Sequence, residues 1–289
     1  MSFSVGIGIV TYNRKDILSD TIDRVRDLTR QPDAALVVAD DGSTDGTLAM
    51  LRDKQVPAIT GANMGIAWNK NRALFLLSQR LNCETVILLE DDTRPSRIGW
   101  ETEWIRAARL WGHVNYAAEW MAQYCVAGSG TAEAPWESTM VTAQCASYAS
   151  TALAYAGYFD PRFKGYGHEH VEHSRRLIRL GYGGTEGRTD TEESVLYKLI
   201  EGGLTVVASK SHHNDIQEQR NQKLALELMT QQEYRAPWRD DAELRQFRSE
   251  IEHSLGTEPA RFRLSPGRPA ATERRPAKPG DFGPLFRPA

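Results

Sequence analysis

Residues Thr85–Pro95 read TVILLEDDTRP, in which a short apolar run leads directly into three consecutive acids. The run Val86–Leu89 includes β-branched residues and is typical of a strand buried on both faces of a parallel sheet. Open α/β sheets bind ligands at the carboxyl ends of such strands, where Glu90, Asp91 and Asp92 stand. Three neighbouring carboxylates repel one another unless a cation lies among them. The run predicts either a site of hard oxygen ligands for Mg²⁺ or Mn²⁺ or a solvated acidic turn.

The composition is that of an ordinary globular protein. The chain has 289 residues, 40% hydrophobic and 25% charged, and a net charge of −3, which predicts one large or two small domains and no bias towards nucleic acid or membranes. No stretch approaches the ~20 apolar residues of a membrane span, and no signal-like segment is recognised, so a cytoplasmic location is expected. Cys83, Cys125 and Cys145 lack metal-type spacing and are predicted to be buried thiols in a reducing compartment.

Strands and helices alternate along the first 95 residues. Strands are predicted over residues 4–10, 34–39, 56–60 and 85–89, and helices over residues 15–29 and 66–81. This alternation predicts a doubly wound parallel sheet. Four strands then place polar residues at one edge of the sheet: Tyr12, Asp41, Asn63 and Asp92. Their convergence predicts a binding site at that edge.

Four motifs follow these strands in order: VTYNR, VADDGSTDGT, NMGIAWNKN and LLEDD. Each is common alone, but the four together resemble the nucleotide-sugar half of family 2 glycosyltransferases of the GT-A fold, over about residues 3–95. The resemblance implies a Rossmann-like, doubly wound, mostly parallel α/β sheet with a smaller acceptor-side sheet and C-terminal helices. It also implies a UDP-sugar donor and Mn²⁺ or Mg²⁺ as cofactors.

By this resemblance, Tyr12 would lie against the uracil face, with Thr11 and Arg14 beside it. Asp41 would accept the uracil imide N–H; alternatively it holds the turn at residues 42–45, a role that Asp40 can also fill. The residues expected near the ribose and pyrophosphate are Asn63, Gly65, Lys70, Glu90 and Asp91, although Lys70 could equally lie on a solvated helix face. Asp92 would bind the metal ion, which neutralises the leaving diphosphate.

Residues 156–183, AGYFDPRFKGYGHEHVEHSRRLIRLGYG, resemble the second signature of the family. There, a Gly-aromatic-Gly turn delivers a Glu-Asp pair onto the start of a helix and supplies the catalytic base. Here Glu169 is followed by His170 in place of Asp. Glu169 is favoured as the base, with Glu172 and His170 as alternatives, since imidazole titrates near neutrality. The competing interpretation is that Glu169 only complements the helix dipole.

A further strand is predicted over residues 203–209, followed by His212 and His213. Histidine is a good ligand for Mn²⁺, and in several GT-A enzymes a late histidine completes the metal site. The resemblance therefore marks His212 or His213 as a metal ligand. The alternative is a surface loop.

The remaining chain is less informative. The predicted organisation is a nucleotide-sugar half at 1–112, an acceptor-binding and catalytic half of the same domain at 113–215, helices at 216–255 and a tail at 256–289. Strands are expected over residues 115–120 and 138–155, and the tryptophans of a helix at 98–112 are expected to pack. The tail holds seven of the thirteen prolines and is expected to be irregular, lying on the body or on a partner.

These features predict an inverting, metal-dependent glycosyltransferase that moves a sugar from a UDP-sugar to an acceptor hydroxyl. The acceptor is open: a glycan, a lipid-linked sugar, a protein or a modified nucleic acid. Two other classes compete, namely a nucleotidyltransferase acting on sugar phosphates and a non-catalytic nucleotide-sugar-binding protein. The first usually needs a glycine-rich basic phosphate loop, which VGIGIVTYNR is not. The second is favoured only by His170.

Overall fold

The computed structural model describes residues 3–188, 193–208, 214–229, 231, 234–255 and 259–264. The strands are β1 Phe3–Thr11, β2 Ala34–Asp40, β3 Ala58–Thr60, β4 Cys83–Glu90, β5 Thr93–Pro95, β6 His113–Tyr116, β7 Cys125–Ala127, β8 Trp136–Ser138, β9 Cys145–Ala149, β10 Gly184–Arg188, β11 Glu193–Ile200 and β12 Leu204–Val206. The helices are α1 Lys15–Leu28, α2 Thr47–Asp53, α3 Ile66–Phe75, α4 Glu101–Trp111, α5 Ser150–Ala156, α6 Glu169–Arg179, α7 Asp215–Leu228 and α8 Asp241–Leu255. A π-helical turn covers Leu76–Arg80, and 3₁₀ helices cover Glu119–Tyr124 and Pro259–Phe262.

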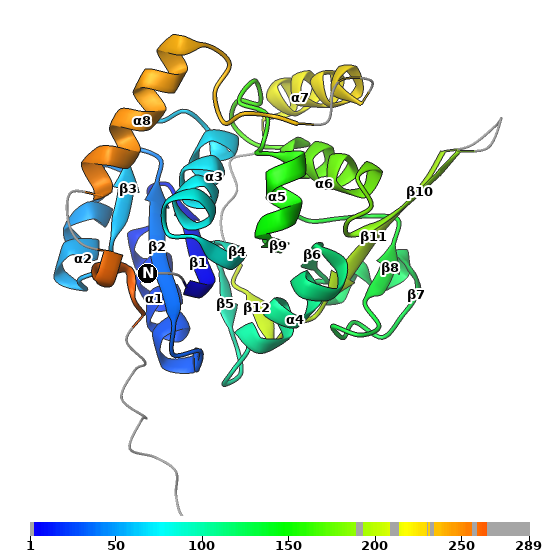
Figure 1. Ribbon diagram of the computed structural model, residues 1–289, viewed down its shortest axis with the longest axis horizontal. Helices are drawn as coiled ribbons and strands as arrows, with labels where there is room; N and C mark the ends of the chain where they lie inside the picture. The colour runs from blue at the N-terminus through cyan, green and yellow to red at the C-terminus, as the bar shows by residue number, and fades with distance from the viewer. Residues whose placement is uncertain are drawn as a thin grey trace, which may run out of the picture.

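The predicted parallel sheet is present. Strands β3, β2, β1 and β4 lie side by side and parallel (Figure 1). Strand β9 then pairs antiparallel with both β4 and β6, and the sheet continues through β11, β8 and β7. Both halves of the chain therefore share one sheet, and β5 and β12 form a second, two-stranded one. The α/β fold class predicted from the sequence is confirmed.

Three details of the second half differ from the sequence predictions. Residues 150–155 form α5 rather than a strand, because Ala152, Leu153 and Ala156 fall on one face at helical spacing and are buried there. The strand expected over residues 115–120 ends at Tyr116, and a 3₁₀ helix follows. The hairpin of β10 and β11 was not predicted.

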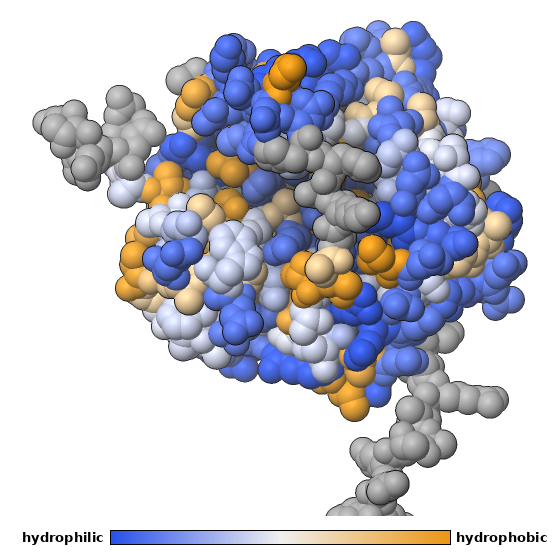
Figure 2. All heavy atoms as spheres, turned by 180° about the vertical axis from the view of Figure 1, so that it is seen from behind, coloured by the Kyte–Doolittle hydropathy of each residue, from blue (hydrophilic) through white to orange (hydrophobic). Residues whose placement is uncertain are grey.

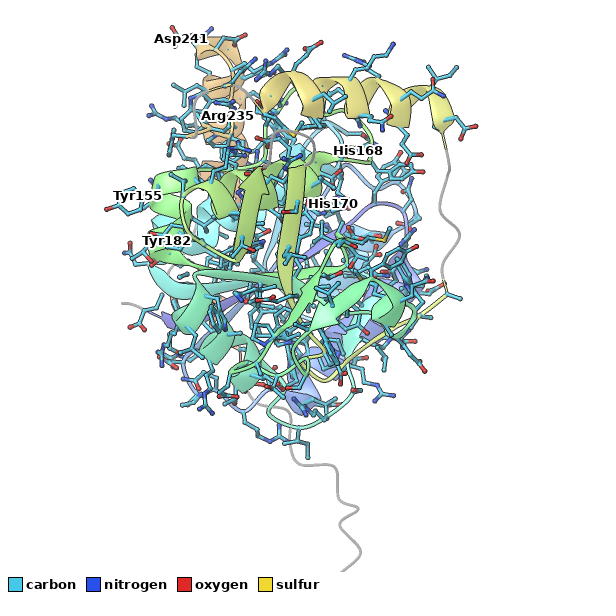
Figure 3. The ribbon with its side chains drawn as sticks, turned by 90° about the vertical axis from the view of Figure 1, so that its right-hand side faces the viewer. Tyr155, His168, His170, Tyr182, Arg235 and Asp241 are labelled. Carbon is cyan, nitrogen blue, oxygen red and sulfur yellow. The ribbon has the colours of Figure 1, made fainter. Side chains whose placement is uncertain are left out.

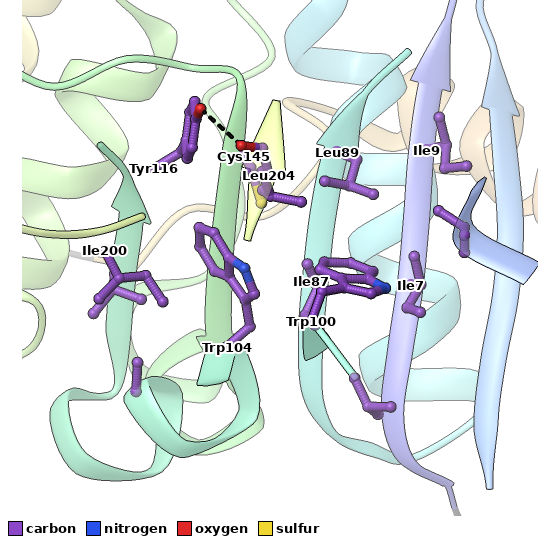
Figure 4. Packing of buried hydrophobic residues seen from close by; sticks show 14 of the residues in the cluster. Ile7, Ile9, Ile87, Leu89, Trp100, Trp104, Tyr116, Cys145, Ile200 and Leu204 are labelled. Atoms are coloured by element: carbon purple, nitrogen blue, oxygen red, sulfur yellow. Dashed lines mark hydrogen bonds between the residues drawn. The ribbon is translucent and has the colours of Figure 1, made fainter. Parts of the chain in front are cut away.

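Hydrophobic clusters cover both faces of the sheet. On one face, Trp100 is fully buried beside Ile7 of β1 and Ile87 of β4, and the fully buried Trp104 lies nearer β9 and Ile200 (Figure 4). The packing role predicted for them is confirmed. On the other face the glycines of β1 allow close packing, because a Cβ on Gly6 would lie 2.8 Å from both Leu77 and Cys83. The GIG pattern of the first strand is therefore explained by the approach of the π-helical turn.

The outer surface is mainly polar. The face shown in Figure 2 is largely hydrophilic, with apolar residues in small separate groups, as is usual for globular proteins. Cys83 and Cys145 are buried as predicted, whereas Cys125 is half-buried. Within the described ranges, every helix is too short or too polar to be a membrane span.

The first part of the tail packs on the sheet. Phe262 and Leu264 are buried, and the Leu264 N–H donates to the Ala34 carbonyl at 2.8 Å. Arg263 also forms a bridge with Ala35, on the part of β2 that β3 does not pair with. Residues 259–264 thus contact the body of the protein. This is one of the two positions, on the body or on a partner, that the sequence predicted for the tail.

This contact predicts where the tail can be cut. Phe262→Ala should lower the free energy of unfolding by ~3–5 kcal/mol, because it leaves a cavity under β2. Urea denaturation measures the loss. A chain ending after Leu264 is the matched control and should unfold like the full-length protein. Equal stability of Phe262→Ala and the parent would show that this contact contributes little.

Candidate functional site

The strand-end acids are joined by one arginine. Arg14, which follows β1, donates from Nη1 to Asp91 Oδ1 at 2.9 Å and to Asp92 Oδ2 at 3.0 Å. Thr11 Oγ1 donates to Asp91 Oδ2 at 2.7 Å, and Thr21 donates to the Asp91 carbonyl. Burial raises the pKa of Asp91 to about 6, although Thr11 and Arg14 oppose the shift. The carboxyl ends of β1 and β4 therefore meet as predicted, around a guanidinium that balances two carboxylates.

Asp91 and Asp92 supply oxygen donors of the kind that bind a divalent ion. Magnesium and similar ions commonly bind through one or two carboxylates together with substrate phosphates, and Asp91 and Asp92 supply hard oxygens that already attract a cation. Asp91 and Asp92 therefore fit a site in which a divalent ion binds two carboxylates and a substrate phosphate. Among the residues that the structure describes, no group of three or more His, Cys, Asp or Glu could hold a metal. His212 and His213 lie outside the described residues.

Asp41 lies at the end of β2 and holds the loop before α3. Its carboxylate accepts the N–H groups of Met64 at 3.0 Å and Gly65 at 2.9 Å, and Arg72 Nη1 at 3.0 Å. Burial raises the pKa of Asp41, and these partners oppose the shift. The adjacent turn is held by Asp40, whose carboxylate accepts the Ser43 N–H. The carboxylate of Asp41 therefore makes no hydrogen bond to that turn and instead holds the loop of the NMG motif at residues 63–65.

Helix α3 carries four consecutive buried polar residues, from Asn69 to Arg72. Asn69 donates to the carbonyls of Thr11 and Ala39, which ties the ends of β1 and β2 together. Asn71 exchanges two hydrogen bonds with the Phe159 backbone at 2.8 and 2.9 Å. The sequence analysis did not single out Asn69, Asn71 or Arg72, although polar residues inside an otherwise apolar helix are a signal for such a role.

Lys70 joins the two parts of the predicted site. Its Nζ lies 3.1 Å from Glu90 Oε1 and 3.2 Å from Glu169 Oε1, and the side chain is 2% exposed. Burial alone would lower the pKa of Lys70, but Glu90 and Glu169 outweigh it and raise the pKa. The alternative of a solvated helix face is therefore wrong for Lys70. Its ammonium connects the end of β4 to the start of α6.

Two glycines bring the two signature motifs into backbone contact. Gly65 has φ +93°, and a Cβ there would lie 2.8 Å from the Gly165 nitrogen. The next residue, Ile66, donates its N–H to the Gly165 carbonyl at 3.1 Å. A left-handed backbone and this approach both require glycine at position 65. The Gly-Tyr-Gly turn at 165–167 thus sits against the loop that Asp41 holds.

Glu169 opens α6 as a buried anion. Its Oε1 contacts Lys70, and its Oε2 accepts the Gly167 N–H at 2.9 Å. Burial would raise the pKa of Glu169, but the charge of Lys70 and the neighbouring His170 outweigh it and lower the pKa. The carboxylate is therefore ionised and a weak proton acceptor. The side chain of Glu169 is 2% exposed.

His170 lies beside this anion and is more accessible. Its Nδ1 is 3.5 Å from Glu169 Oε1, and its side chain is 20% exposed. Among the described residues, that buried Nδ1 has no hydrogen-bond partner. Figure 3 labels His168 and His170 at the N-terminal end of α6. Glu169 and His170 are thus close neighbours, but the structure shows no hydrogen bond between them.

Glu172, the other alternative base, has different partners from Glu169. Both of its oxygens accept hydrogen bonds from Arg176 at 2.9 Å, and Arg176 also donates to the carbonyls of Ala156 and Tyr158. Glu172 and Arg176 are buried, so this ion pair anchors α6 to the loop after α5.

Tyr12 and Asn63 are exposed at the sheet edge, with 46% of Tyr12 accessible.

Part of the chain that carries this site matches a known protein family. The family model described as Glycosyl transferase family 2 matches residues 6–101. Residues 6–101 are therefore similar to glycosyl transferase family 2. The matched segment contains Arg14, Asp41, Lys70 and the strand-end acids. The resemblance read from the four motifs is therefore confirmed. No curated protein sequence matches the chain.

Solved structures with a similar fold are glycosyltransferases. The mannosyltransferase PcManGT from Pyrobaculum calidifontis, in complex with GDP-Man and Mn²⁺, is 18% identical over 63% of this chain and 54% of its own, with a TM-score of 0.50. GalNAc-T7, with UDP, GalNAc and Mn²⁺, is 12% identical over 87% and 55%, with a TM-score of 0.54. Residues 1–349 of S. aureus TarS are 12% identical over 88% and 71%, with a TM-score of 0.50. The chain thus spans about half the length of the first two, and the likeness shows the GT-A fold.

Proposed function

We propose that this glycosyltransferase moves a sugar from a UDP-sugar to an acceptor hydroxyl with inversion, assisted by Mn²⁺ or Mg²⁺. The observation that supports this most strongly is the buried bridge from Glu90 through Lys70 to Glu169. It fixes the donor-side acids of the first signature against the catalytic helix of the second. The fold neighbours that bind UDP or GDP-Man with Mn²⁺ are consistent with the proposal.

On the donor side, the end of β4 would receive the diphosphate. Asp92, with Asp91 beside it, would hold the divalent ion, which neutralises the charge of the leaving diphosphate. Arg14 contributes a positive charge at the same point, since it already bridges both carboxylates. Glu90 is the acid next to Lys70 and is proposed to contact the ribose. Preorganised charges of this kind stabilise a developing anion without reorganising during the reaction.

On the acceptor side, the hydroxyl proton needs a positioned base. Glu169 was favoured from sequence, but its carboxylate is buried, engaged by two partners and weakly basic. We therefore assign proton acceptance to His170, with Glu169 orienting the ring and stabilising the imidazolium that forms. The acceptor oxygen then bonds to the anomeric carbon from the face opposite the diphosphate, as the bond to the diphosphate oxygen breaks. This single displacement is what makes the enzyme inverting.

The function is tested by following UDP release. The full-length protein is incubated with a panel of UDP-sugars and Mn²⁺, with and without EDTA, and free UDP is quantified. Release that depends on the protein and on the metal is expected, at least by slow hydrolysis to water. Release of pyrophosphate from UTP and a sugar 1-phosphate would instead identify a nucleotidyltransferase. Binding without turnover of any donor, even with mixed glycan acceptors, would identify a non-catalytic binding protein.

Asp41 should set the preference for the base. A carboxylate can accept the imide N–H of uracil, whereas cytosine presents the acceptor N3 at that position, and a buried acceptor left without a donor costs ~1–3 kcal/mol. UDP is therefore expected to bind more tightly than CDP by that amount, measured by calorimetry with Mn²⁺ present. GDP is included because guanine also offers N–H donors. Equal affinity for UDP and CDP would remove Asp41 from base recognition, and a clear preference for GDP would change the donor assignment.

A further inference from the structure

A large cavity is lined mainly by residues of the second half of the chain. Its volume is about 1110 Å³, and its walls are the 3₁₀ helix Glu119–Tyr124, the ends of β6 and β8, and β12. Ligand pockets for drug-sized molecules span roughly 300–1,000 Å³. The cavity therefore has room for a molecule larger than a single sugar ring.

Backbone hydrogen bonds connect the cavity wall to the site. Gln144, which lines the cavity, accepts the Glu90 N–H through its carbonyl at 2.9 Å. Val206 also lines it, and the next N–H along the chain, that of Val207, donates to the Asp92 carbonyl at 2.8 Å. Two of the three strand-end acids thus contact the backbone that forms the cavity. A molecule bound there lies beside the place where the donor diphosphate is proposed to bind.

Two tryptophans give the cavity an aromatic lining. Trp120 and Trp136 both line it, and Trp120 is 54% exposed. The Trp120 ring is braced by Tyr124 in an edge-on contact, with 6.3 Å between ring centroids. The face of an indole carries partial negative charge, which favours the weakly positive C–H groups on one side of a sugar ring. An exposed, braced indole is therefore suited to stacking on a carbohydrate.

The polar lining favours hydroxyl donors and disfavours anions. The side-chain Oε1 of Gln144 is buried, and among the described residues it has no hydrogen-bond partner. A buried acceptor in this condition is normally satisfied by a ligand or water. Arg97 forms an ion pair with Glu103, and the lining also includes Glu119 and Glu201. The lining carries three carboxylates and one guanidinium, so polyphosphates and nucleic acids are repelled, whereas sugar hydroxyls find acceptors.

We propose that this cavity binds the acceptor and that the acceptor is a neutral oligosaccharide, stacked on Trp120 with a hydroxyl donating to Gln144. The proposal rests on the proposed function for the identity of the bound molecule as acceptor. Binding of the saccharide itself does not require transfer. This choice separates a glycan from the protein and nucleic-acid acceptors that the sequence left open.

The test measures saccharide binding without a donor. Saturation-transfer NMR is recorded with neutral tetrasaccharides (cellotetraose, maltotetraose, mannotetraose and chitotetraose) and with an oligothymidylate as the anionic probe. At least one tetrasaccharide should bind the full-length protein. Trp120→Ala should weaken it by about tenfold or more, the effect typical of removing an aromatic anchor. Trp120→Phe should restore part of the affinity. Gln144→Leu should weaken it independently.

The matched control is Tyr155→Ala. Tyr155 is another exposed aromatic, 65% accessible, on α5 outside the cavity (Figure 3), and its loss should leave saccharide binding unchanged. Binding of oligothymidylate but of no tetrasaccharide would overturn the proposal, and so would saccharide binding that is indifferent to Trp120. If saccharide binding depends on Trp120 but no UDP-sugar is turned over, the cavity assignment stands and the proposed transfer fails. If UDP is released but no saccharide binds, the reverse holds.

Discussion

Replacing His170 by asparagine is expected to lower kcat by ~10²–10⁴-fold while leaving the Kd for UDP-sugar unchanged. That factor is the usual contribution of a positioned general base. An acceptor hydroxyl is a weak nucleophile until its proton is accepted in the transition state. His170 Nδ1 lies 3.5 Å from the ionised Glu169, and such contacts often tighten only when substrate is bound. Single-turnover kinetics with saturating donor measure the effect on the chemical step.

The neighbouring His168 provides a matched control. His168 has φ +65°, a left-handed conformation that asparagine adopts readily. His168→Asn therefore makes the same chemical change two residues away without backbone strain, and it should be nearly silent. In addition, added imidazole should partly restore activity to His170→Ala, because it supplies the missing base.

The opposite pattern would return the role to Glu169. If Glu169→Gln is inactive while His170→Asn is mild, the carboxylate itself accepts the proton, as the sequence favoured. For Glu169 to act as the base, its carboxylate would have to accept a proton despite the charge of Lys70, which lowers its pKa. Lys70→Met should then raise the apparent pKa in the pH profile of kcat.

Glu172→Gln is expected to change the stability of the fold instead. It leaves Arg176 buried without its carboxylate, which typically costs ~3–5 kcal/mol of unfolding free energy.

The sequence predicted the donor half well because its signals are local. Each strand of that half is a short apolar run ending in polar residues, and parallel strands must bring those ends to one edge. Thr11, Arg14, Asp91 and Asp92 accordingly meet within hydrogen-bonding distance. The family match over residues 6–101 falls on the same stretch.

The remaining features depend on partners distant in sequence. Lys70 was expected near phosphate, but its position is set by Glu90 and by Glu169, which lies 99 residues away. Arg72 likewise contacts Glu250 on α8 at 3.0 Å. The same residue types on an isolated helix would read as a solvated face. Only the packing of α3 against the sheet, α6 and α8 makes them buried connectors, so periodicity alone could not reveal them.

Asp92→Asn is expected to lower kcat/KM by on the order of 10²–10³-fold, because a metal ion contributes several kcal/mol to stabilising the leaving diphosphate. Asparagine keeps the shape of Asp92 but removes the charge that holds the ion. Mn²⁺ binding in the presence of UDP, followed by electron paramagnetic resonance, should weaken in parallel. Asp20→Asn is the control, because Asp20 is an exposed acid on α1 with a side chain that is 69% accessible.

Arg14 offers the alternative source of positive charge. Its guanidinium already contacts Asp91 and Asp92, and a cation in that position could stabilise the diphosphate without a metal. If the arginine does this work, EDTA and Asp92→Asn should both be mild, while Arg14→Met should abolish turnover. If the metal does it, Arg14→Met should weaken donor binding but leave turnover dependent on Mn²⁺. The balance between these two variants therefore decides whether the acids at the end of β4 hold a metal ion or orient an arginine.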